Sequence, residues 1–226
     1  MFNIPELHLA SVIMDMAAIF ILVGLLIYTR IYRRRGHLDD KLFFHITIIA
    51  VIMAVSDAVT YIIDGSSVPH SALICMICNN VYFISFEMFI GILAVYMYYR
   101  VGKNKDKITR IGAYIMSPAL VTCVLILINN FTRFLFWVDP DTNKYEDYAA
   151  YPIVFIAPLI YGIFIVFAVF KQQKKAVVLL ALLVVIRLVS GFLFRGVSST
   201  GVLFSMGLVF MHLFEMGLPY YREERV

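Results

Sequence analysis

The chain lacks the sequence motifs on which the common soluble enzymes are built. It contains no Walker loop, no glycine-rich dinucleotide turn, no HExxH pair and no GxSxG elbow, so phosphate, zinc and serine chemistries have no motif to act through. Its longest connection between apolar stretches, residues 129–150, is too short for a catalytic domain. We therefore expect that the protein is not an enzyme. We predict no catalytic residue, and the sequence names no cofactor.

Cysteine is also scarce, with only Cys75, Cys78 and Cys123 in the chain. The first two lie one helical turn apart near the outer end of one apolar stretch, and Cys123 lies at a comparable depth in the next. A disulfide from Cys123 to either of them is geometrically conceivable. Buried thiols that stay reduced are the commoner arrangement, and we expect it here.

What the chain does contain is apolar sequence. Hydrophobic residues make up 62% of the chain and its mean hydropathy is +0.88, which is too apolar for a soluble domain of this length. A bilayer core about 30 Å thick needs roughly 20 mostly apolar residues in a helix. Seven stretches meet this requirement, near residues 9–30, 42–63, 71–99, 111–128, 151–170, 176–194 and 201–219. We predict an all-α integral membrane bundle of seven transmembrane helices that forms a single domain over residues 1–226.

The basic residues predict how this bundle is oriented. Fifteen of the 19 lysines and arginines fall in connections on one side: Arg30, Arg33, Arg34, Arg35, Lys41, Arg100, Lys103, Lys105, Lys107, Arg110, Lys171, Lys174, Lys175, Arg222 and Arg225. Only Arg133, Lys144 and Arg195 fall on the other side. By the positive-inside rule, the N-terminus is outside and the C-terminus is cytoplasmic. We expect a multi-pass protein of the plasma membrane. Its positive charge faces the anionic inner leaflet, so no nucleic-acid partner is expected.

Ionisable residues at membrane depth are the most informative candidates for a site. They are Asp15, Asp57, Glu87, Arg187 and Glu215. A charge at a helix centre in hydrocarbon costs roughly 2.5–3.5 kcal/mol, so such groups face the bundle interior and usually have partners. Asp15, Asp57 and Arg187 each lie about two turns from the outer end of a span, and Glu87 lies nearer the midplane. They form either a ligand pocket or charge switch, or a structural ion pair between spans one, two and six.

Helical spacing adds two further groups. Asn80, Glu87 and Gly91 share one face of the third span, a pattern that builds either a pocket or an ordinary helix contact. His212 and Glu215 share a face of the last span near the cytoplasmic side. A histidine and a glutamate at this spacing can bind a metal, but with no second ligand set we predict no metal site. Asn80, His212 and Glu215 join the candidate ligand or switch residues.

The connection 129–150 is predicted to cover the outer mouth of the bundle. Its aromatic first half, which includes Trp137, precedes an acidic turn and then Tyr145 and Tyr148. Such a segment suits a lid lying at the membrane interface. Pro118 and Pro158 are expected to kink spans four and five and to open space between helices.

Three runs of sequence resemble a known family. They are FLFWVDPDTNKYEDYAAYPIVFIAPLIYGIF, the following KQQKK, and VVIRLVSGFLFRGVSSTGVLFSMGLVFMHLF. Together they are similar to the N-terminal seven-helix sensor region of bacterial diguanylate cyclases and, more distantly, of some histidine kinases. The resemblance implies an outer signal that is read by the bundle and passed through the last span to a cytoplasmic output domain. No GGDEF or kinase segment follows YYREERV, so we expect a separated sensor module or a free-standing relative.

These observations predict a membrane receptor or sensor that reads an extracytoplasmic or intramembrane signal. Its expected partners are the lipid bilayer, a small ligand of unknown identity, a cytoplasmic signalling domain or protein and, as one option, a second copy of the chain. The alternative is an ion- or proton-coupled transporter or channel that uses the intramembrane Asp, Glu and Arg residues. A retinal photoreceptor shares the topology. However, its Schiff base needs a lysine within a span, and the last span has none.

Overall fold

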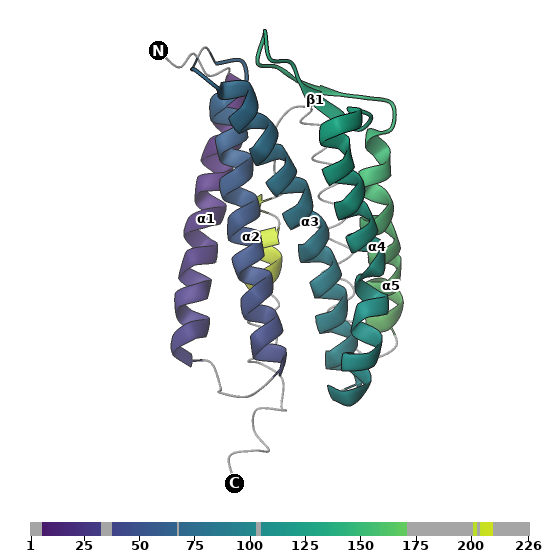
Figure 1. Ribbon diagram of the computed structural model, residues 1–226. Helices are drawn as coiled ribbons and strands as arrows, with labels where there is room; N and C mark the ends of the chain where they lie inside the picture. The colour runs from purple at the N-terminus through teal and green to yellow at the C-terminus, as the bar shows by residue number, and fades with distance from the viewer. Residues whose placement is uncertain are drawn as a thin grey trace.

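Four long helices dominate the part of the chain that the structure describes. The computed structural model describes residues 6–32, 38–66, 68–102, 105–170, 201–202 and 204–209. The long helices are α1 (Glu6–Tyr32), α2 (Leu38–Ile63), α3 (Ser71–Gly102) and α4 (Lys105–Thr132), and they run alongside one another (Figure 1). Successive helices run in opposite directions. The ends of α2 and α4 therefore lie at the same end of the bundle as the starts of α1 and α3.

These four helices are long and apolar enough to cross a membrane. The qualifying segments are His8–Ile31, Leu38–Ile63, Ser71–Tyr99 and Arg110–Thr132. They confirm the first four predicted spans and the all-α membrane bundle. Lipid cannot hydrogen bond to a backbone, so an apolar run of this length forms a helix that bonds to itself. At 32 residues, α3 is roughly 48 Å long, which exceeds the hydrocarbon thickness, as its sequence predicts.

The segment after α4 differs from the prediction. Residues 129–150 contain a small antiparallel hairpin of β1 (Phe136–Val138) and β2 (Tyr145–Asp147). A 3-10 turn, η1 (Tyr151–Phe155), then leads into α5 (Ile156–Phe170), which has only 15 residues. The predicted span 151–170 therefore begins with a 3-10 turn, which has Pro152 in its first turn, rather than with an α-helix. Pro158 lies in the first turn of α5, where its missing N–H interrupts no bond within that helix.

The rest of the predicted bundle is described only in part. The predicted sixth span, 176–194, lies outside the described residues, and so does most of the seventh. The described residues 201–202 and 204–209 are helical and lie beside α1 and α2 (Figure 1). They form the start of the predicted last span, and we call them the 201–209 segment.

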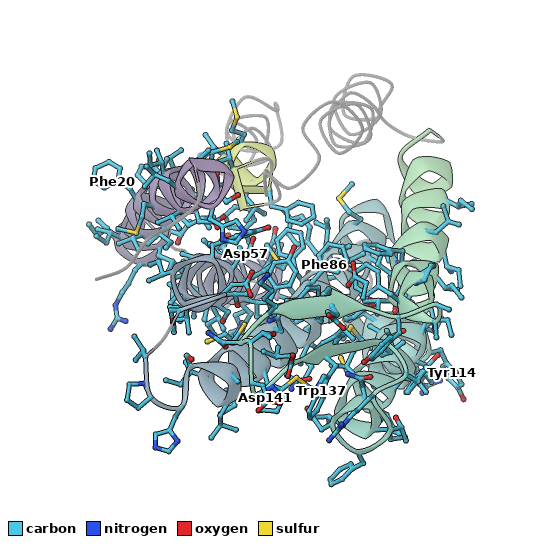
Figure 2. The ribbon with its side chains drawn as sticks, turned by 90° about the horizontal axis from the view of Figure 1, so that it is seen from above. Phe20, Asp57, Phe86, Tyr114, Trp137 and Asp141 are labelled. Carbon is cyan, nitrogen blue, oxygen red and sulfur yellow. The ribbon has the colours of Figure 1, made fainter. Side chains whose placement is uncertain are left out.

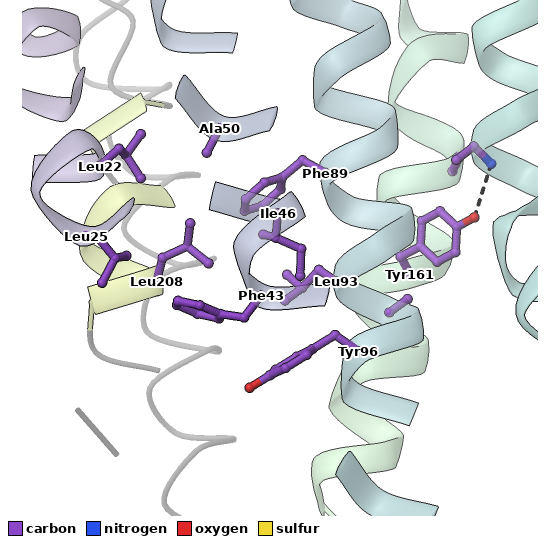
Figure 3. Packing of buried hydrophobic residues seen from close by; sticks show 13 residues of the cluster. Leu22, Leu25, Phe43, Ile46, Ala50, Phe89, Leu93, Tyr96, Tyr161 and Leu208 are labelled. Atoms are coloured by element: carbon purple, nitrogen blue, oxygen red, sulfur yellow. Dashed lines mark hydrogen bonds between the residues drawn. The ribbon is translucent and has the colours of Figure 1, made fainter. Parts of the chain in front are cut away.

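The core lies between α2 and α3 and extends to the 201–209 segment. α2 packs against α1 and α3, and α3 packs against α4 and α5. Figure 3 shows Leu208 beside Leu22 and Leu25 of α1, and Phe89 of α3 facing Ile46 of α2. These side chains form one continuous cluster that ties the 201–209 segment to the first three helices.

Large apolar side chains cover the outer faces of the bundle. Phe20 of α1 is 82% exposed and Phe131 of α4 is 89% exposed. Figure 2 shows Phe20 and Tyr114 at the periphery, whereas Asp57 lies inside. In water, such apolar surface would be an aggregation liability, but in a bilayer it is solvated by lipid. The outer faces of the helices therefore suit a lipid environment, while an acidic residue such as Asp57 is kept inside.

Candidate functional site

A line of polar residues joins α1 to α2 along the halves nearer the start of α1, which we call their outer halves. His8, Ser11 and Asp15 follow one face of α1 at spacings of three and four residues. Asp57, Tyr61 and Asp64 follow the facing side of α2 and the turn after it. Because the two helices run in opposite directions, these residues meet as three successive pairs, which we call the polar ladder. It extends roughly 10 Å into the bundle, since seven residues of helix separate His8 from Asp15.

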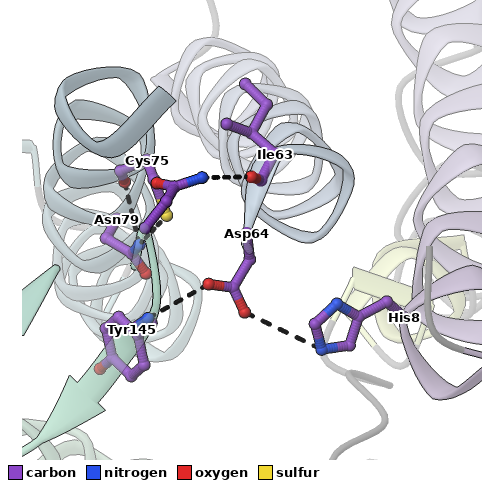
Figure 4. Close-up of polar contacts among 7 residues, drawn as sticks. His8, Ile63, Asp64, Cys75, Asn79 and Tyr145 are labelled. Atoms are coloured by element: carbon purple, nitrogen blue, oxygen red, sulfur yellow. Dashed lines mark hydrogen bonds and ion pairs between the residues drawn. The ribbon is translucent and has the colours of Figure 1, made fainter. Parts of the chain in front are cut away.

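The first pair lies at the outer end of the ladder. Nε2 of His8 is 3.9 Å from Oδ2 of Asp64 (Figure 4), and both side chains are partly exposed. This distance suits an ion pair when the histidine is protonated but is too long for a hydrogen bond. The His8 ring also contacts the Tyr61 ring edge to face, with centroids 5.3 Å apart. His8 therefore connects the outer surface to the second pair.

The second and third pairs lie deeper: Ser11, Asp15 and Asp57 are buried, and Tyr61 is partly exposed. Tyr61 is hydrogen bonded to Ser11, which is fully buried. The carboxyl groups of Asp15 and Asp57 lie close enough to act on each other and on Tyr61 electrostatically. Asp15 is fully buried, and neither of its carboxyl oxygens accepts a hydrogen bond within the described part of the chain. The ladder thus ends at a carboxyl group that has no hydrogen-bonding partner among the residues the structure describes.

Asp15 is also in tight contact with the 201–209 segment. A Cβ atom added to Gly201 would lie 2.8 Å from Oδ1 of Asp15 and 3.6 Å from the Cβ of Ala54 in α2. Glycine therefore allows this close approach, whereas a larger residue would require the Asp15 carboxyl group or the helix to shift. The contact places the deepest residue of the ladder against the start of the predicted last span.

A second polar site lies on the other side of α3. Glu87 is fully buried, and neither carboxyl oxygen has a hydrogen-bonding partner among the described residues. It acts electrostatically on Cys123 of α4 and on Tyr161 of α5. Asn80 donates a hydrogen bond to Oδ1 of Asn130 in α4, at 2.7 Å. The face of α3 that carries Asn80 and Glu87 therefore packs on α4, away from the ladder.

Beside Glu87, α4 lacks one backbone hydrogen-bond donor, because Pro118 within it has no N–H. The hydroxyl of Tyr161 donates a hydrogen bond to the carbonyl of Ile115 at 2.6 Å and accepts one from the N–H of Ala119 at 3.1 Å (Figure 3). Ala119 and Ile115 are the pair that an uninterrupted helix would bond directly, so the hydroxyl is inserted into the helix. A Cβ on Gly91 would lie 3.1 Å from the Cβ of Ala119, so α3 and α4 are in close contact at this point.

The hairpin closes the outer end of the ladder. Asn143 donates hydrogen bonds to the carbonyls of Ile63 and Ser66, at 2.7 and 3.1 Å, and its own carbonyl accepts one from the N–H of Gly65. The N–H of Tyr145 donates to Oδ1 of Asp64, the partner of His8 (Figure 4). Asn143 has φ +53°, a left-handed conformation that asparagine tolerates better than most residues. These contacts hold the lid on the turn that follows α2.

The base of the lid is built on Asn129. Its side chain donates to the carbonyl of Phe136 and accepts from the N–H of Leu135, so the chain reverses directly after α4. The guanidinium of Arg133 lies 3.7 Å from the centre of the Trp137 ring, a cation–π contact at the outer surface. The two tyrosines of this segment differ in burial. The hydroxyl of Tyr145 is buried, which raises its pKa, whereas the side chain of Tyr148 is exposed.

The structure therefore brings some of the candidate residues together and separates others. Asp15 and Asp57 meet, whereas Glu87 and Asn80 belong to the second site. Arg187, His212 and Glu215 lie outside the described residues, and with them the predicted pairing of Arg187. Cys75, Cys78 and Cys123 are free thiols. No group of three potential metal-ligating side chains occurs within the described ranges.

Several residues of the site are not among the sequence candidates. His8 and Ser11 share a helical face with Asp15, so a wider search at helical spacing would have found them. Asn143, Tyr161 and Gly201 carry no such signal, because their roles depend on which segment lies opposite them. No family model, no curated protein and no solved structure matches the chain.

Proposed function

We propose that the protein is a receptor-type sensor of the plasma membrane, with seven spans, its N-terminus outside and its C-terminus in the cytoplasm. It reads a signal at the polar ladder and passes the signal through the last span to a cytoplasmic output domain or protein. The contact between Asp15 and Gly201 carries this proposal. Any change in charge or position at Asp15 acts directly on the start of the last span, because the two touch.

The lid supports the same function. It is hydrogen bonded to the turn after α2, and Asp64 in that turn is also the outermost acid of the ladder. A signal that alters the ladder therefore acts on the lid at one end and on the last span at the other. A ligand shifts such a bundle only by its difference in affinity for two helix arrangements. The contact of Asp64 with the lid and the contact of Asp15 with Gly201 would both change between two helix arrangements, and they provide that difference in affinity.

A fusion protein tests the proposal. Residues 1–226 are joined to a cyclase output domain, and cyclase activity is measured for Gly201→Ala and for Gly24→Ala. The added methyl group collides with Asp15 at position 201 but meets nothing within 4 Å at position 24, on α1. We expect Gly201→Ala to change the output and Gly24→Ala to leave it unchanged. Equal outputs from both variants and the parent would contradict a signal that passes through this contact.

Topology is tested separately by cysteine labelling. Lys144 lies in the hairpin and Lys105 at the start of α4, at opposite ends of that helix. An impermeant maleimide applied to intact cells should label Lys144→Cys and not Lys105→Cys. The unsubstituted chain measures the background from its three cysteines. The reverse pattern would overturn the proposed orientation.

The second candidate is an ion- or proton-coupled transporter, and the site around Glu87 favours it. A buried carboxyl group beside an interrupted helix is the arrangement that transporters use to bind a coupling ion at mid-membrane. If the protein is a transporter, proteoliposomes will show substrate-driven ion flux that Glu87→Gln abolishes. Absence of such flux, together with a responsive fusion, decides for the sensor.

A further inference from the structure

We infer that the signal bound at the polar ladder is a proton, which enters at His8 and Asp64 and binds the carboxyl group of Asp15. This inference rests on the proposed function, since it names the ligand of the same site. It makes the protein a sensor of the proton concentration on the lid side of the membrane.

The first argument is the state of Asp15. A charged carboxylate buried in hydrocarbon without a hydrogen-bond donor is costly, and the cost is removed by a counter-ion or by a proton. Within the described residues, Asp15 faces Asp57 and Tyr61 from α2, and no basic group. The 201–209 segment presents Gly201 and has no titratable side chain among its described residues. Asp57 increases the need for neutralisation, because it is a second acid.

The second argument is the room available. A metal cation needs several oxygen ligands around it, and an organic ligand needs a pocket. The side chain of Asp15 is fully buried, and a methyl group placed on Gly201 would lie 2.8 Å from its Oδ1, so it would fit only if the carboxyl group moved. A proton requires neither space nor coordination. The geometry therefore favours a proton over a larger ligand.

The third argument is access. Every pair in the ladder carries a group that accepts and releases protons: His8 with Asp64, Tyr61 with Ser11, and Asp57 with Asp15. A proton taken from external water at His8 or Asp64 ends as an O–H bond on Asp15. The hydroxyls of Tyr61 and Ser11 each take up one proton and release another, so they finish unchanged. The net change is one proton removed from the outer medium and one negative charge neutralised at Asp15.

The consequence for signalling follows from the contact with Gly201. With its proton, Asp15 is neutral and the last span packs tightly against it. When the proton leaves, two carboxylates face each other beside an apolar backbone, and their repulsion favours an arrangement that admits water. Alkaline medium on the lid side is therefore expected to loosen the start of the last span.

Infrared spectroscopy of the whole chain in lipid nanodiscs tests this inference. A protonated carboxyl group has a C=O stretch that is separate from the bands of a carboxylate. We expect such a band at neutral pH, lost in Asp15→Asn and retained in Asp141→Asn, which removes an exposed acid of the lid. Carbon-13 labelling of aspartate should shift the band in the unsubstituted protein, which assigns the band to an aspartic acid, and its loss in Asp15→Asn then assigns it to Asp15. A spectrum without an aspartic acid band at neutral pH would overturn the inference.

A second measurement tests the route. Hydrogen–deuterium exchange of the Asp15 band should be slower in Tyr61→Phe than in the parent, because the variant lacks the hydroxyl of the middle pair. Tyr114→Phe, at an exposed tyrosine on α4, should exchange at the parental rate. Equal rates in all three proteins would refute entry through the ladder.

Failure of the inference can be told apart from failure of the proposed function. If the Asp15 band is present but the cyclase fusion gives the same output at every external pH, the proton site stands and the sensor function is wrong. If the fusion responds through Gly201 but no Asp15 band exists, the sensor stands and its ligand is not a proton.

Discussion

Replacing Asn143 by glycine is expected to release the outer hairpin from α2. The Asn143 side chain is 4% exposed and donates two hydrogen bonds, to the carbonyls of Ile63 and Ser66. A neutral hydrogen bond contributes about 1 kcal/mol net, so losing both should lower the free energy of local opening by about 2 kcal/mol. Glycine keeps the left-handed conformation at this position without strain, so the change removes the two hydrogen bonds without distorting the backbone.

Hydrogen exchange of the Gly65 and Tyr145 amides, which join the hairpin to the turn after α2, measures this opening. The N–H of Gly65 donates to the carbonyl of Asn143, and the N–H of Tyr145 donates to Asp64. A loss of about 2 kcal/mol should speed their exchange by about 30-fold. The amides in the middle of α2 should be unaffected, because opening of the hairpin leaves that helix intact.

Two further variants sharpen the result. Asn143→Ala should exchange faster still, because a left-handed conformation costs a non-glycine residue a further ~1–2 kcal/mol. Thr142→Ala, at the position before Asn143, removes an exposed hydrogen bond to Asp139. It should change the exchange of the Gly65 and Tyr145 amides little. Parental exchange rates at Gly65 and Tyr145 in Asn143→Gly would show that Asn143 does not hold the lid.

Three other predictions concern separate parts of the molecule. Tyr161→Phe removes the hydroxyl inserted at Ile115 and Ala119 and should lower the free energy of unfolding in detergent by about 1–2 kcal/mol; an unchanged melting temperature would contradict the insertion. Hydrogen bonds from the N–H of Asp141 and the hydroxyl of Thr142 hold the pKa of Asp139 below its ordinary 3.8. The charged carboxylate therefore stabilises the hairpin above pH 3.8, and this stabilisation is lost as the pH falls through the lower pKa of the folded protein. A carbon-13 NMR titration of Asp139 should show the lowered pKa. Added retinal should produce no visible band that hydroxylamine bleaches, since the predicted last span contains no lysine.

The sequence by itself determined the membrane helices. Apolar runs predicted near 42–63 and 71–99 correspond to α2 (Leu38–Ile63) and to α3 (Ser71–Gly102). This success has a local cause, because a bilayer forces each apolar segment to satisfy its own backbone hydrogen bonds within a helix. The same cost rule singled out Asp15, Asp57 and Glu87 as interior groups, and the structure buries all three.

Only the tertiary structure decided which of these groups meet. Hydropathy predicts how deep a residue lies but not which neighbouring helix faces it. Glu87 therefore lies against α4 and α5, while Asp15 lies against α2 and Gly201. The position of the hairpin also depends on distant partners, since Asn143 is held by carbonyls near the end of α2. Periodicity arises within one segment, whereas a contact depends on two, and that is why the helices were predictable and the ladder was not.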